Sequence, residues 1–344
     1  PVQAAMVDAH GSQCGFCTPG FVMSMFALYQ QGSAPNKEQV NVALGGNLCR
    51  CTGYRPIIDA ALASCTGTPQ DKFSQQQAAT IAQLNALPKN DVGLDTLFMP
   101  TNRNELAATI KAAPNARLFA GSTDIALEVT QKLKSLPTLI GLTQVKELQV
   151  VEETSSGLKI GAAVPFSKME ALLLKHFPSL HELLDRFAST PIRNQATLGG
   201  NVANASPIGD MPPALLALNA VIKVDNGTTR RDIAISDFFT GYRQTLLQSH
   251  EWIEAIFIPY LKPSDQVRAY KISKRQEDDI SAVCAVFNLA LDENNKVTQL
   301  KSGFGGVAAT PASVDALSDA IKGKDWSKNS TFELGKKVLS ESFT

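Results

Sequence analysis

The sequence lacks an excess of charge of either sign. Its 344 residues carry 32 basic and 32 acidic side chains, so the formal net charge is zero at pH 7. Proteins that bind nucleic acid or anionic membranes usually carry a basic surplus, and this balance argues against both kinds of partner. The sequence also lacks an uninterrupted apolar run of about 18 residues, so we expect no membrane-spanning helix.

The chain lacks a start methionine and a basic segment ahead of an apolar stretch. It begins with Pro1, Val2 and Gln3, which does not resemble a secretory signal peptide. We therefore expect a cytoplasmic protein and a piece of a longer chain. Its length indicates two or three domains.

Cysteine is scarce, and four of the six residues are grouped in two close pairs, Cys14-x-x-Cys17 and Cys49-x-Cys51. Secreted disulfide scaffolds are usually short and cysteine-dense, so this pattern favours metal binding or redox chemistry. Four thiolates suit a [2Fe–2S] cluster. A structural zinc site is the alternative, although the Cys-x-Cys spacing is atypical for it. Plain buried cysteines are the third interpretation.

The isolated Cys65 and Cys284 are expected to be small buried apolar side chains. Around the grouped cysteines the sequence predicts helices over residues 21–29, 36–44 and 54–63. Asn36 is suited to cap the second helix, and Pro56 to lie in the first turn of the third. Residues 1–66 contain few charged side chains, which is typical of a small domain whose surface is covered by partners.

Two segments carry a family resemblance. Gln13-Cys-Gly-Phe-Cys-Thr-Pro-Gly20 and Asn47-Leu-Cys-Arg-Cys-Thr-Gly-Tyr-Arg-Pro56 together resemble the helical [2Fe–2S] domain of the molybdenum hydroxylases, the family of xanthine dehydrogenase and aldehyde oxidase. The resemblance implies that Cys14, Cys17, Cys49 and Cys51 hold a [2Fe–2S] cluster. It also implies an upstream ferredoxin-like [2Fe–2S] domain that is absent from this chain. A separate large subunit would bind the molybdenum cofactor, within a larger assembly of such heterodimers.

The residue composition changes after the first domain. Residues 67–92 are polar and glutamine-rich without a clear period until about Ala78, and predict a linker with a short helix. A capped helix is predicted over 100–111, with Thr101 or Asn102 at its N-cap. A strand over 116–120 then runs into Gly121-Ser-Thr-Asp124 and a helix over 125–133. Such a turn either exposes N–H groups to an anion or is an ordinary strand-to-helix connection.

The segment from Thr197 to Asp210 alternates small residues with short polar side chains. On composition alone it is either a cofactor-binding loop or a polar glycine-rich loop. Together with residues 117–125 it resembles the two flavin-binding loops of the same family. The resemblance implies a PCMH-type FAD fold, like that of vanillyl-alcohol oxidase, over residues 93–262. The implied FAD-binding residues are Leu118, Phe119, Ala120, Gly121, Ser122, Thr123, Asp124, Phe187, Ala188, Thr197, Gly200, Asn201, Asn204, Ser206, Asp210, Ile253 and Lys271.

The last part, residues 263–344, predicts an α+β lobe. Strands are expected over 269–273, 281–290 and 297–306, and helices over 311–323 and 331–340. It resembles the C-terminal domain of the family's flavoprotein part, and we expect it to be truncated. Fold class is thus multidomain: an all-α [2Fe–2S] domain, a PCMH-type FAD domain and a C-terminal α+β domain.

The sequence offers no firm catalytic residue, because its four histidines are scattered. The resemblance implies that Tyr242 and Asp278 lie on the NAD side of the flavin. The other interpretation of the charged segment 274–280 is a solvated turn.

The predicted function is electron transfer in a xanthine dehydrogenase, from a molybdenum subunit through [2Fe–2S] to FAD and on to NAD. Residues 190–197 look most like bacterial xanthine dehydrogenase small subunits. One alternative is a subunit serving an aldehyde or another N-heterocycle. An alternative of another class is a zinc-stabilised binding module without redox chemistry.

Overall fold

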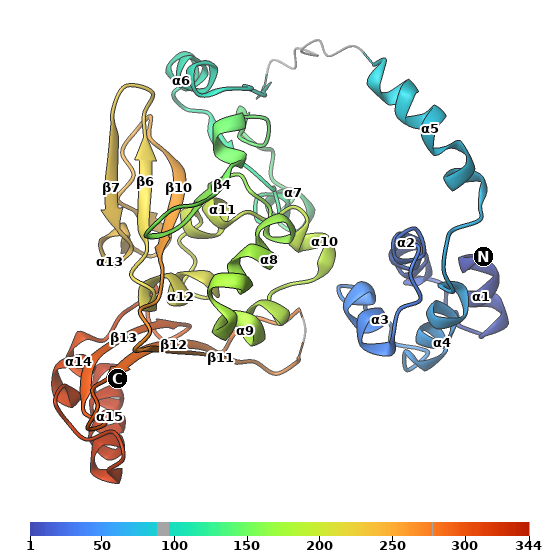
Figure 1. Ribbon diagram of the computed structural model, residues 1–344. Helices are drawn as coiled ribbons and strands as arrows, with labels where there is room; N and C mark the ends of the chain where they lie inside the picture. The colour runs from blue at the N-terminus through green and yellow to red at the C-terminus, as the bar shows by residue number, and fades with distance from the viewer. Residues whose placement is uncertain (88–95, 277, 344) are drawn as a thin grey trace. The chain divides into compact units, whose positions relative to one another are not determined.

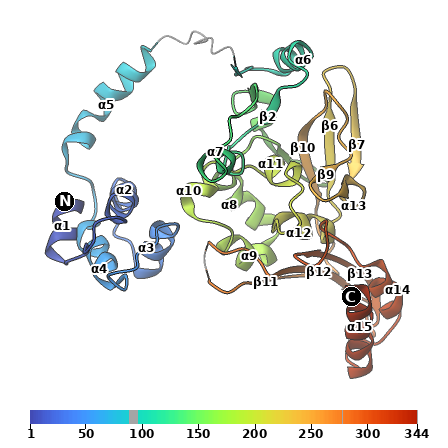
Figure 2. The same cartoon turned by 180° about the vertical axis from the view of Figure 1, so that it is seen from behind.

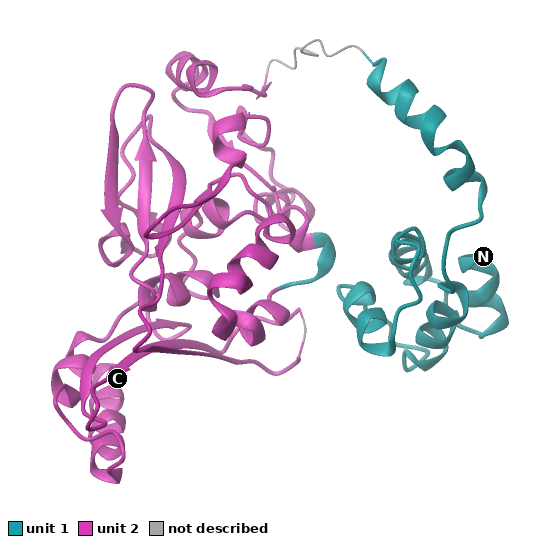
Figure 3. Ribbon diagram, viewed as in Figure 1, with its two compact units in different colours: residues 1–92, 188–191 teal, residues 93–187, 192–344 magenta. Residues whose placement is uncertain are grey.

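The chain divides into two compact units. The structure, a computed structural model, describes residues 1–87, 96–276 and 278–343 (Figure 1). The first unit comprises residues 1–92 with 188–191, and the second comprises residues 93–187 with 192–344 (Figure 3). No described helix is both long and apolar enough to cross a membrane.

The first unit is helical. Its helices are α1 (Val2–Asp8), α2 (Thr18–Tyr29), α3 (Lys37–Leu44), α4 (Arg55–Ser64) and α5 (Lys72–Asn85). The predicted cap of α3 is present, because the Asn36 side chain accepts from the Gln39 N–H while the Gln39 side chain accepts from the Asn36 N–H, both at 2.9 Å. Phe21, Met25 and Ile57 are fully buried between α2, α3 and α4. Burial of this kind stabilises short helices that are marginal alone.

The helix expected in the linker is present as α5, but it begins at Lys72, before the helical period that the sequence shows from about Ala78. It begins at Lys72 because Asp71 forms a capping box with Ser74, accepting from the Ser74 N–H at 2.9 Å. None of its residues is buried, and Phe73 is 57% exposed. Local capping, rather than an apolar face, therefore defines where this helix starts. Part of the expected linker, 88–92, lies outside the described residues.

The second unit contains a small parallel sheet and a larger antiparallel one. The parallel sheet has the order β1-β3-β2, with β1 (Leu97–Phe98), β3 (Leu139–Gly141) and β2 (Arg117–Phe119). The antiparallel sheet has the order β4-β5-β10-β6-β7, with strands β4 (Val151–Glu153), β5 (Gly157–Gly161), β10 (Trp252–Pro259), β6 (Val221–Asp225) and β7 (Arg230–Ala234). Strand β10 is central and largely apolar, as expected for a strand paired on both sides.

The helices around these sheets are short. They are α6 (Arg103–Ala112), α7 (Ala126–Thr130), η1 (Lys146–Gln149), α8 (Phe166–His176), η2 (Pro178–Leu180), α9 (His181–Asp185), α11 (Leu198–Ala203), α12 (Met211–Ala217) and α13 (Ile235–Phe238). Helix α10 (Thr190–Arg193) is divided between the two units after Pro191. Asn102 caps α6, which is one of the two predicted caps. Helix α7 ends four residues after it begins, so the helix expected over 125–133 is too long. A hairpin of β8 (Phe239–Gly241) and β9 (Gln244–Thr245) completes this part.

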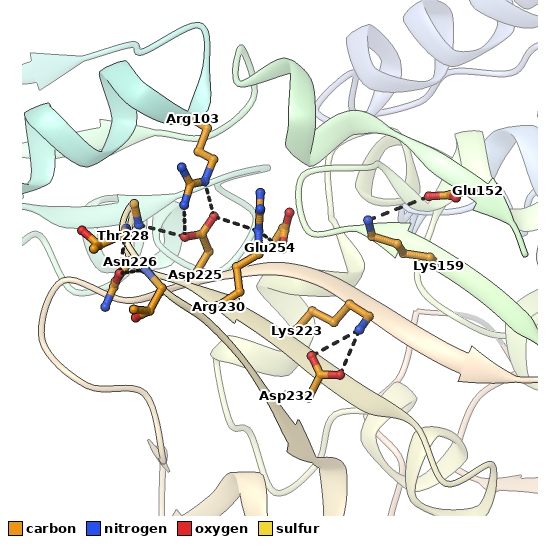
Figure 4. Close-up of polar contacts among 12 residues, drawn as sticks. Arg103, Glu152, Lys159, Lys223, Asp225, Asn226, Thr228, Arg230, Asp232 and Glu254 are labelled. Atoms are coloured by element: carbon orange, nitrogen blue, oxygen red, sulfur yellow. Dashed lines mark hydrogen bonds and ion pairs between the residues drawn. The ribbon is translucent and has the colours of Figure 1, made fainter.

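Buried charge fixes α6 to the β6–β7 hairpin. Arg103 donates from Nε and Nη2 to the two carboxylate oxygens of Asp225, at 2.6 and 2.8 Å (Figure 4). The same carboxylate accepts from the Gly227 N–H at 2.8 Å and lies 3.5 Å from Arg230 Nε. Asp225 is only 1% exposed, so these partners replace the water that its charge loses.

The C-terminal lobe is a three-stranded antiparallel sheet with helices on one face (Figure 2). Its elements are β11 (Asp265–Ile272), β12 (Val283–Leu291), β13 (Val297–Gly305), α14 (Asp315–Ile321) and α15 (Asn329–Ser342). Leu300, Phe304 and Leu317 form a buried cluster between sheet and helices. The opposite face contacts α12. The predicted α+β content is therefore present, with longer β11 and α15 and a shorter α14 than expected.

Candidate cofactor sites

The four grouped cysteines lie in the two turns that connect the helices of the first unit. Cys14 lies between α1 and α2, where Cys17 is the N-cap of α2, and Cys49 and Cys51 lie between α3 and α4. Helix ends leave main-chain N–H groups without helical partners, so such turns offer donors to sulfur. Gly53 follows Cys51 with a φ of 69°, a left-handed conformation that favours glycine.

The four thiols form two pairs. Cys14 Sγ lies 3.5 Å from Cys51 Sγ, and the Cys17 and Cys49 side chains are also in hydrogen-bonding contact. A [2Fe–2S] cluster held by four cysteines takes two thiolates on each iron, which this donor set fits. A structural zinc needs four donors around one ion. Within the described ranges, no group of three or more His, Cys, Asp or Glu side chains is placed to hold one ion. The two sulfur pairs fit the donor set of a two-iron cluster.

One thiol in each pair is set to ionise more easily than an ordinary cysteine. A hydrogen bond from the Thr52 hydroxyl, 3.2 Å from the sulfur, and the Thr52 N–H lower the pKa of Cys49 to about 7. The main-chain N–H of Phe16 lowers the pKa of Cys14. Burial raises the pKa of Cys17, and the hydrogen bond with Cys14 raises the pKa of Cys51. Thiolate is the form that binds metal, so each pair contains one favoured ligand.

The remaining two cysteines are buried, as the sequence predicts. Cys65 is 2% exposed and Cys284 is 1% exposed. Burial raises the pKa of both thiols, that of Cys284 to about 12. Neither thiol is therefore suited to bind a metal as a thiolate.

A cavity of about 550 Å³ lies in the second unit. This volume is typical of sites for small molecules and cofactors. The cavity is formed by the segment after β2, by α11 and the turn before it, and by single residues of other elements. Its lining comprises Arg117, Leu118, Phe119, Ala120, Gly121, Ser122, Thr123, Asp124, Ile125, Phe187, Ile192, Ala196, Thr197, Gly200, Asn201, Ala203, Asn204 and Arg243.

The first wall turns sharply after β2. A Cβ atom at Gly121 would overlap the carbonyl of Gln195, so only glycine lets the two wall segments approach so closely. Ser122 follows with a φ of 64°, an uncommon conformation for a residue other than glycine. Strained backbone of this kind is concentrated at ligand sites, because the turn must present its N–H groups in one direction.

The second wall is the start of α11. Thr197 caps this helix by accepting from the Gly200 N–H at 3.0 Å. The neighbouring Asn201 Oδ1 is buried and has no hydrogen-bond partner. A buried, unpaired polar atom is costly in a folded protein and on a cavity wall indicates a bound group that completes it. The ribose and ribityl hydroxyls of FAD are donors of this kind, so the wall fits the cofactor.

The expected aromatic wall residue, Phe187, also lines the cavity. It is 7% exposed, and its ring centroid lies 4.3 Å from that of Phe166. One face of the ring is thus held by core packing while the residue borders the cavity. The position of Phe187 is therefore compatible with core packing and with contact to a cofactor.

Five of the residues implied by the resemblance do not line the cavity. Ala188 belongs to the first unit, with a φ of 51°. Ser206 and Ile253 are buried in the second unit, 8% and 4% exposed. Asp210 and Lys271 form an ion pair at 2.7 Å, and Ser281 Oγ lies 2.5 Å from the other Asp210 oxygen. The charges of Asp210 and Lys271 therefore neutralise each other in the structure.

The two implied NAD-side residues do not line the cavity either. Tyr242 is 63% exposed, in the turn of the β8–β9 hairpin. Asp278 is half-buried with a φ of 48°, and its carbonyl accepts from Arg275 Nη2 at 3.4 Å. The neighbouring Asp279 also accepts from Arg275, at 2.8 Å. Arg275, Asp278 and Asp279 are thus held together by hydrogen bonds within their own turn.

Six lining residues were not among those that the resemblance implied, namely Arg117, Ile125, Ile192, Ala196, Ala203 and Arg243. Four of them are apolar and give no chemical signal. Arg243 follows Tyr242 directly, but only the hairpin turn brings its guanidinium to the cavity. Its position therefore depends on tertiary structure.

Three protein families match consecutive parts of the chain. Residues 1–62 match the [2Fe-2S] binding domain, residues 91–261 match the FAD binding domain in molybdopterin dehydrogenase, and residues 268–344 match the CO dehydrogenase flavoprotein C-terminal domain. The four cysteines fall in the first match, and all the lining residues of the cavity fall in the second.

Curated relatives are similar over almost the whole chain. Xanthine dehydrogenase 1 of Arabidopsis thaliana is 30% identical, with 96% of this chain and 30% of that protein aligned. Xanthine dehydrogenase of Drosophila pseudoobscura pseudoobscura is 34% identical, over 90% and 28%. The chain thus spans less than a third of the length of these relatives.

Solved structures share the fold of most of the chain. A carbon monoxide dehydrogenase chain from Hydrogenophaga pseudoflava superposes with a TM-score of 0.67 at 21% identity, covering 72% of this chain and 86% of that one. A chain of quinoline 2-oxidoreductase from Pseudomonas putida 86 gives 0.65 at 23% identity, covering 73% and 87%. The predicted fold class is confirmed.

The chain belongs to the molybdenum hydroxylase family, as its iron–sulfur and FAD electron-transfer module. Cys14, Cys17, Cys49 and Cys51 form a donor set that fits a [2Fe–2S] cluster, and the cavity with its unpaired Asn201 oxygen fits FAD. When bound, these groups supply the electron-transfer chemistry of the oxidoreductase.

Proposed function

We propose that this chain is the electron-transfer part of a xanthine dehydrogenase. The chain would hold the [2Fe–2S] cluster and the FAD, and these groups would supply electron transfer from purine oxidation on a separate molybdenum subunit to NAD⁺ as acceptor. One observation carries the proposal: a paired set of four thiols and a cavity of about 550 Å³ with an unpaired Asn201 oxygen occur on the same chain. The chain itself supplies ligands and cavity walls for both groups.

The residues of this chain have distinct tasks in the proposal. The thiolates of the two cysteine pairs hold the cluster, and Thr52 stabilises the Cys49 thiolate with its hydroxyl. The turn at Gly121 to Thr123 presents main-chain N–H groups to the diphosphate of FAD. Asn201 accepts a hydrogen bond from a hydroxyl of the cofactor. Buried Phe187 keeps water from that wall.

The choice of xanthine rests on the relatives that align over almost the whole chain. The substrate pocket would lie on the molybdenum subunit, so the purine is tested in the complex. Copurification of that subunit should give NADH formation with xanthine or hypoxanthine. Activity only with an aldehyde or with another N-heterocycle would replace xanthine dehydrogenase by the corresponding hydroxylase.

The cofactor and the acceptor are tested on the full chain. We expect a brown protein with about two iron atoms and one FAD per chain, a [2Fe–2S] electron spin resonance signal after reduction, and no zinc. Anaerobic addition of NADH should bleach the flavin absorption, since hydride transfer between NADH and FAD is reversible. A flavin that is reduced by dithionite but not by NADH would rule out NAD as acceptor. A colourless zinc-loaded protein would support the non-redox binding module instead.

A further inference from the structure

Two cations lie on the wall of the cavity, Arg117 and Arg243. Arg117 Nη1 forms an ion pair with the Glu128 carboxylate at 2.7 Å. The Glu128 side chain is 24% exposed. Its charge is therefore balanced within its own wall segment. FAD would bring a diphosphate with two negative charges into the same cavity. Because Arg117 is already paired with Glu128, another cation is needed to bind the phosphates.

Arg243 is placed differently. It occupies the two-residue turn between β8 and β9, with a left-handed φ of 53°. Its Nη1 donates to Asn204 Oδ1 at 3.2 Å and lies 3.6 Å from Asp124 Oδ2. Asp124 lies on the first wall and Asn204 on the second, so one guanidinium reaches both walls from a third element.

The Arg243 guanidinium has N–H donors that can bind a further group. Its contact with Asp124 is long for a charge-assisted bond, and both side chains are about two-fifths exposed, at 44% and 41%. A guanidinium has five N–H donors in a planar fork that matches phosphate oxygens, and the contacts with Asn204 and Asp124 both use Nη1. A weak, exposed ion pair exchanges easily for a stronger bidentate one.

We infer that Arg243 binds the diphosphate of FAD, exchanging its loose contact with Asp124 for charge-assisted hydrogen bonds to phosphate oxygens. This inference rests on the binding of FAD in the cavity. It adds a specificity residue from the β8–β9 hairpin to the two loops that the sequence motifs identify.

The test compares ligands that differ by the diphosphate. FAD is removed from the full chain, and its Kd is measured from the quenching of flavin fluorescence. ADP and adenosine are then titrated as competitors. We expect R243Q to weaken FAD and ADP about 10- to 100-fold and adenosine less than about twofold, because a charged hydrogen-bonding partner of the phosphates is lost. R243K keeps the charge but loses the fork, and should fall between wild type and R243Q.

Arg268→Gln is the matched control. Arg268 is an exposed arginine of β11 whose guanidinium donates to the Val267 carbonyl at 2.9 Å, and it does not line the cavity. Its FAD and ADP affinities should equal those of wild type. The R243Q loss should also be larger at 50 mM than at 500 mM salt, since screening weakens a charge-based contact.

Three outcomes overturn the inference. Equal losses for ADP and adenosine would mean that Arg243 only holds the walls together. Unchanged FAD affinity with a raised KM for NADH would place the residue at the acceptor nucleotide. Unchanged affinity and unchanged KM would leave it without a ligand role. If wild type itself binds neither FAD nor ADP, the proposed function fails instead, so the two failures are distinct.

Discussion

Arg186 and Lys271 exchange hydrogen bonds, each side chain donating to the other residue's main-chain carbonyl. Arg186 Nη1 lies 2.5 Å from the Lys271 oxygen, and Lys271 Nζ lies 3.0 Å from the Arg186 oxygen. Lys271 also pairs with Asp210 at 2.7 Å. Arg186 precedes Phe187 of the cavity wall, while Lys271 belongs to β11. The exchange therefore ties the C-terminal lobe to the segment that carries the cavity.

Lys271→Met should strongly destabilise the second unit. Asp210 is 8% exposed, and removal of the ammonium leaves a buried carboxylate without its charge partner. We expect a loss of about 3–5 kcal/mol in the free energy of unfolding, measured by urea denaturation. The double variant K271M/D210N should recover part of the loss, because the unpaired charge is gone. Additive losses in the double variant would show that the two side chains do not act as a pair.

Cys49→Ser should remove the cluster without removing the flavin. The serine hydroxyl does not ionise at neutral pH and is a poor ligand for iron–sulfur clusters, so the [2Fe–2S] spin resonance signal should be lost while FAD content stays at the wild-type value. Cys65→Ala is the control, because Cys65 is buried away from the pairs and should keep the signal. Loss of FAD with an intact cluster signal would contradict the assignment of the two cofactors to separate units.

Asp225 should make stability depend on acid pH. Burial acts to raise the pKa of Asp225, but hydrogen bonds from Arg103 and Gly227 outweigh it and hold the pKa below its usual value. A lowered folded-state pKa stabilises the protein above the unfolded-state pKa of about 3.9, and this contribution disappears as the pH falls through the folded-state pKa. Asp225→Asn should therefore cost about 3 kcal/mol at pH 7 and progressively less below about pH 4.

The exposed pair of Asp232 and Lys223 is the control for that measurement (Figure 4). Its atoms are 3.0 Å apart, but the Asp232 side chain is 58% exposed. Asp232→Asn should change the free energy of unfolding by less than about 1 kcal/mol across the same pH range. A D225N effect that does not shrink in acid would mean that the carboxylate charge is not what stabilises the hairpin.

Gly121→Ala should disturb the cavity more than the fold. The added Cβ would overlap the Gln195 carbonyl, so the two walls must separate and FAD affinity should fall more than about tenfold, measured by flavin fluorescence. Gly335→Ala is a contrasting control in α15, where the nearest atom, Leu317 Cδ1, would be 3.5 Å away. That change should stabilise the protein by up to about 1 kcal/mol through helix propensity and leave FAD affinity unchanged.

Local features were accessible from the sequence because they depend on neighbouring residues. The cap at Asn36 is a short-range pattern that appears in the structure as expected, and the close cysteine spacing places each sequence pair in one turn. A short helix was expected in the linker, but its start at Lys72 was not, because its apolar period is weak before Ala78, although the Asp71 and Ser74 capping signal was present. The antiparallel sheet around β10 was not predicted, since β10 pairs with β5 across about a hundred positions.

The sequence by itself determined the chemistry of this protein: four thiols at cluster spacing, two polar glycine-containing segments, and the order of the domains. Tertiary structure decided which of the implied residues meet. It joined Leu118 and Asn201 on one cavity, paired Asp210 with Lys271 and brought Arg243 to the wall. The physical reason is that spacing fixes only local geometry, whereas the partner of a buried charge or an unpaired oxygen depends on how distant segments pack.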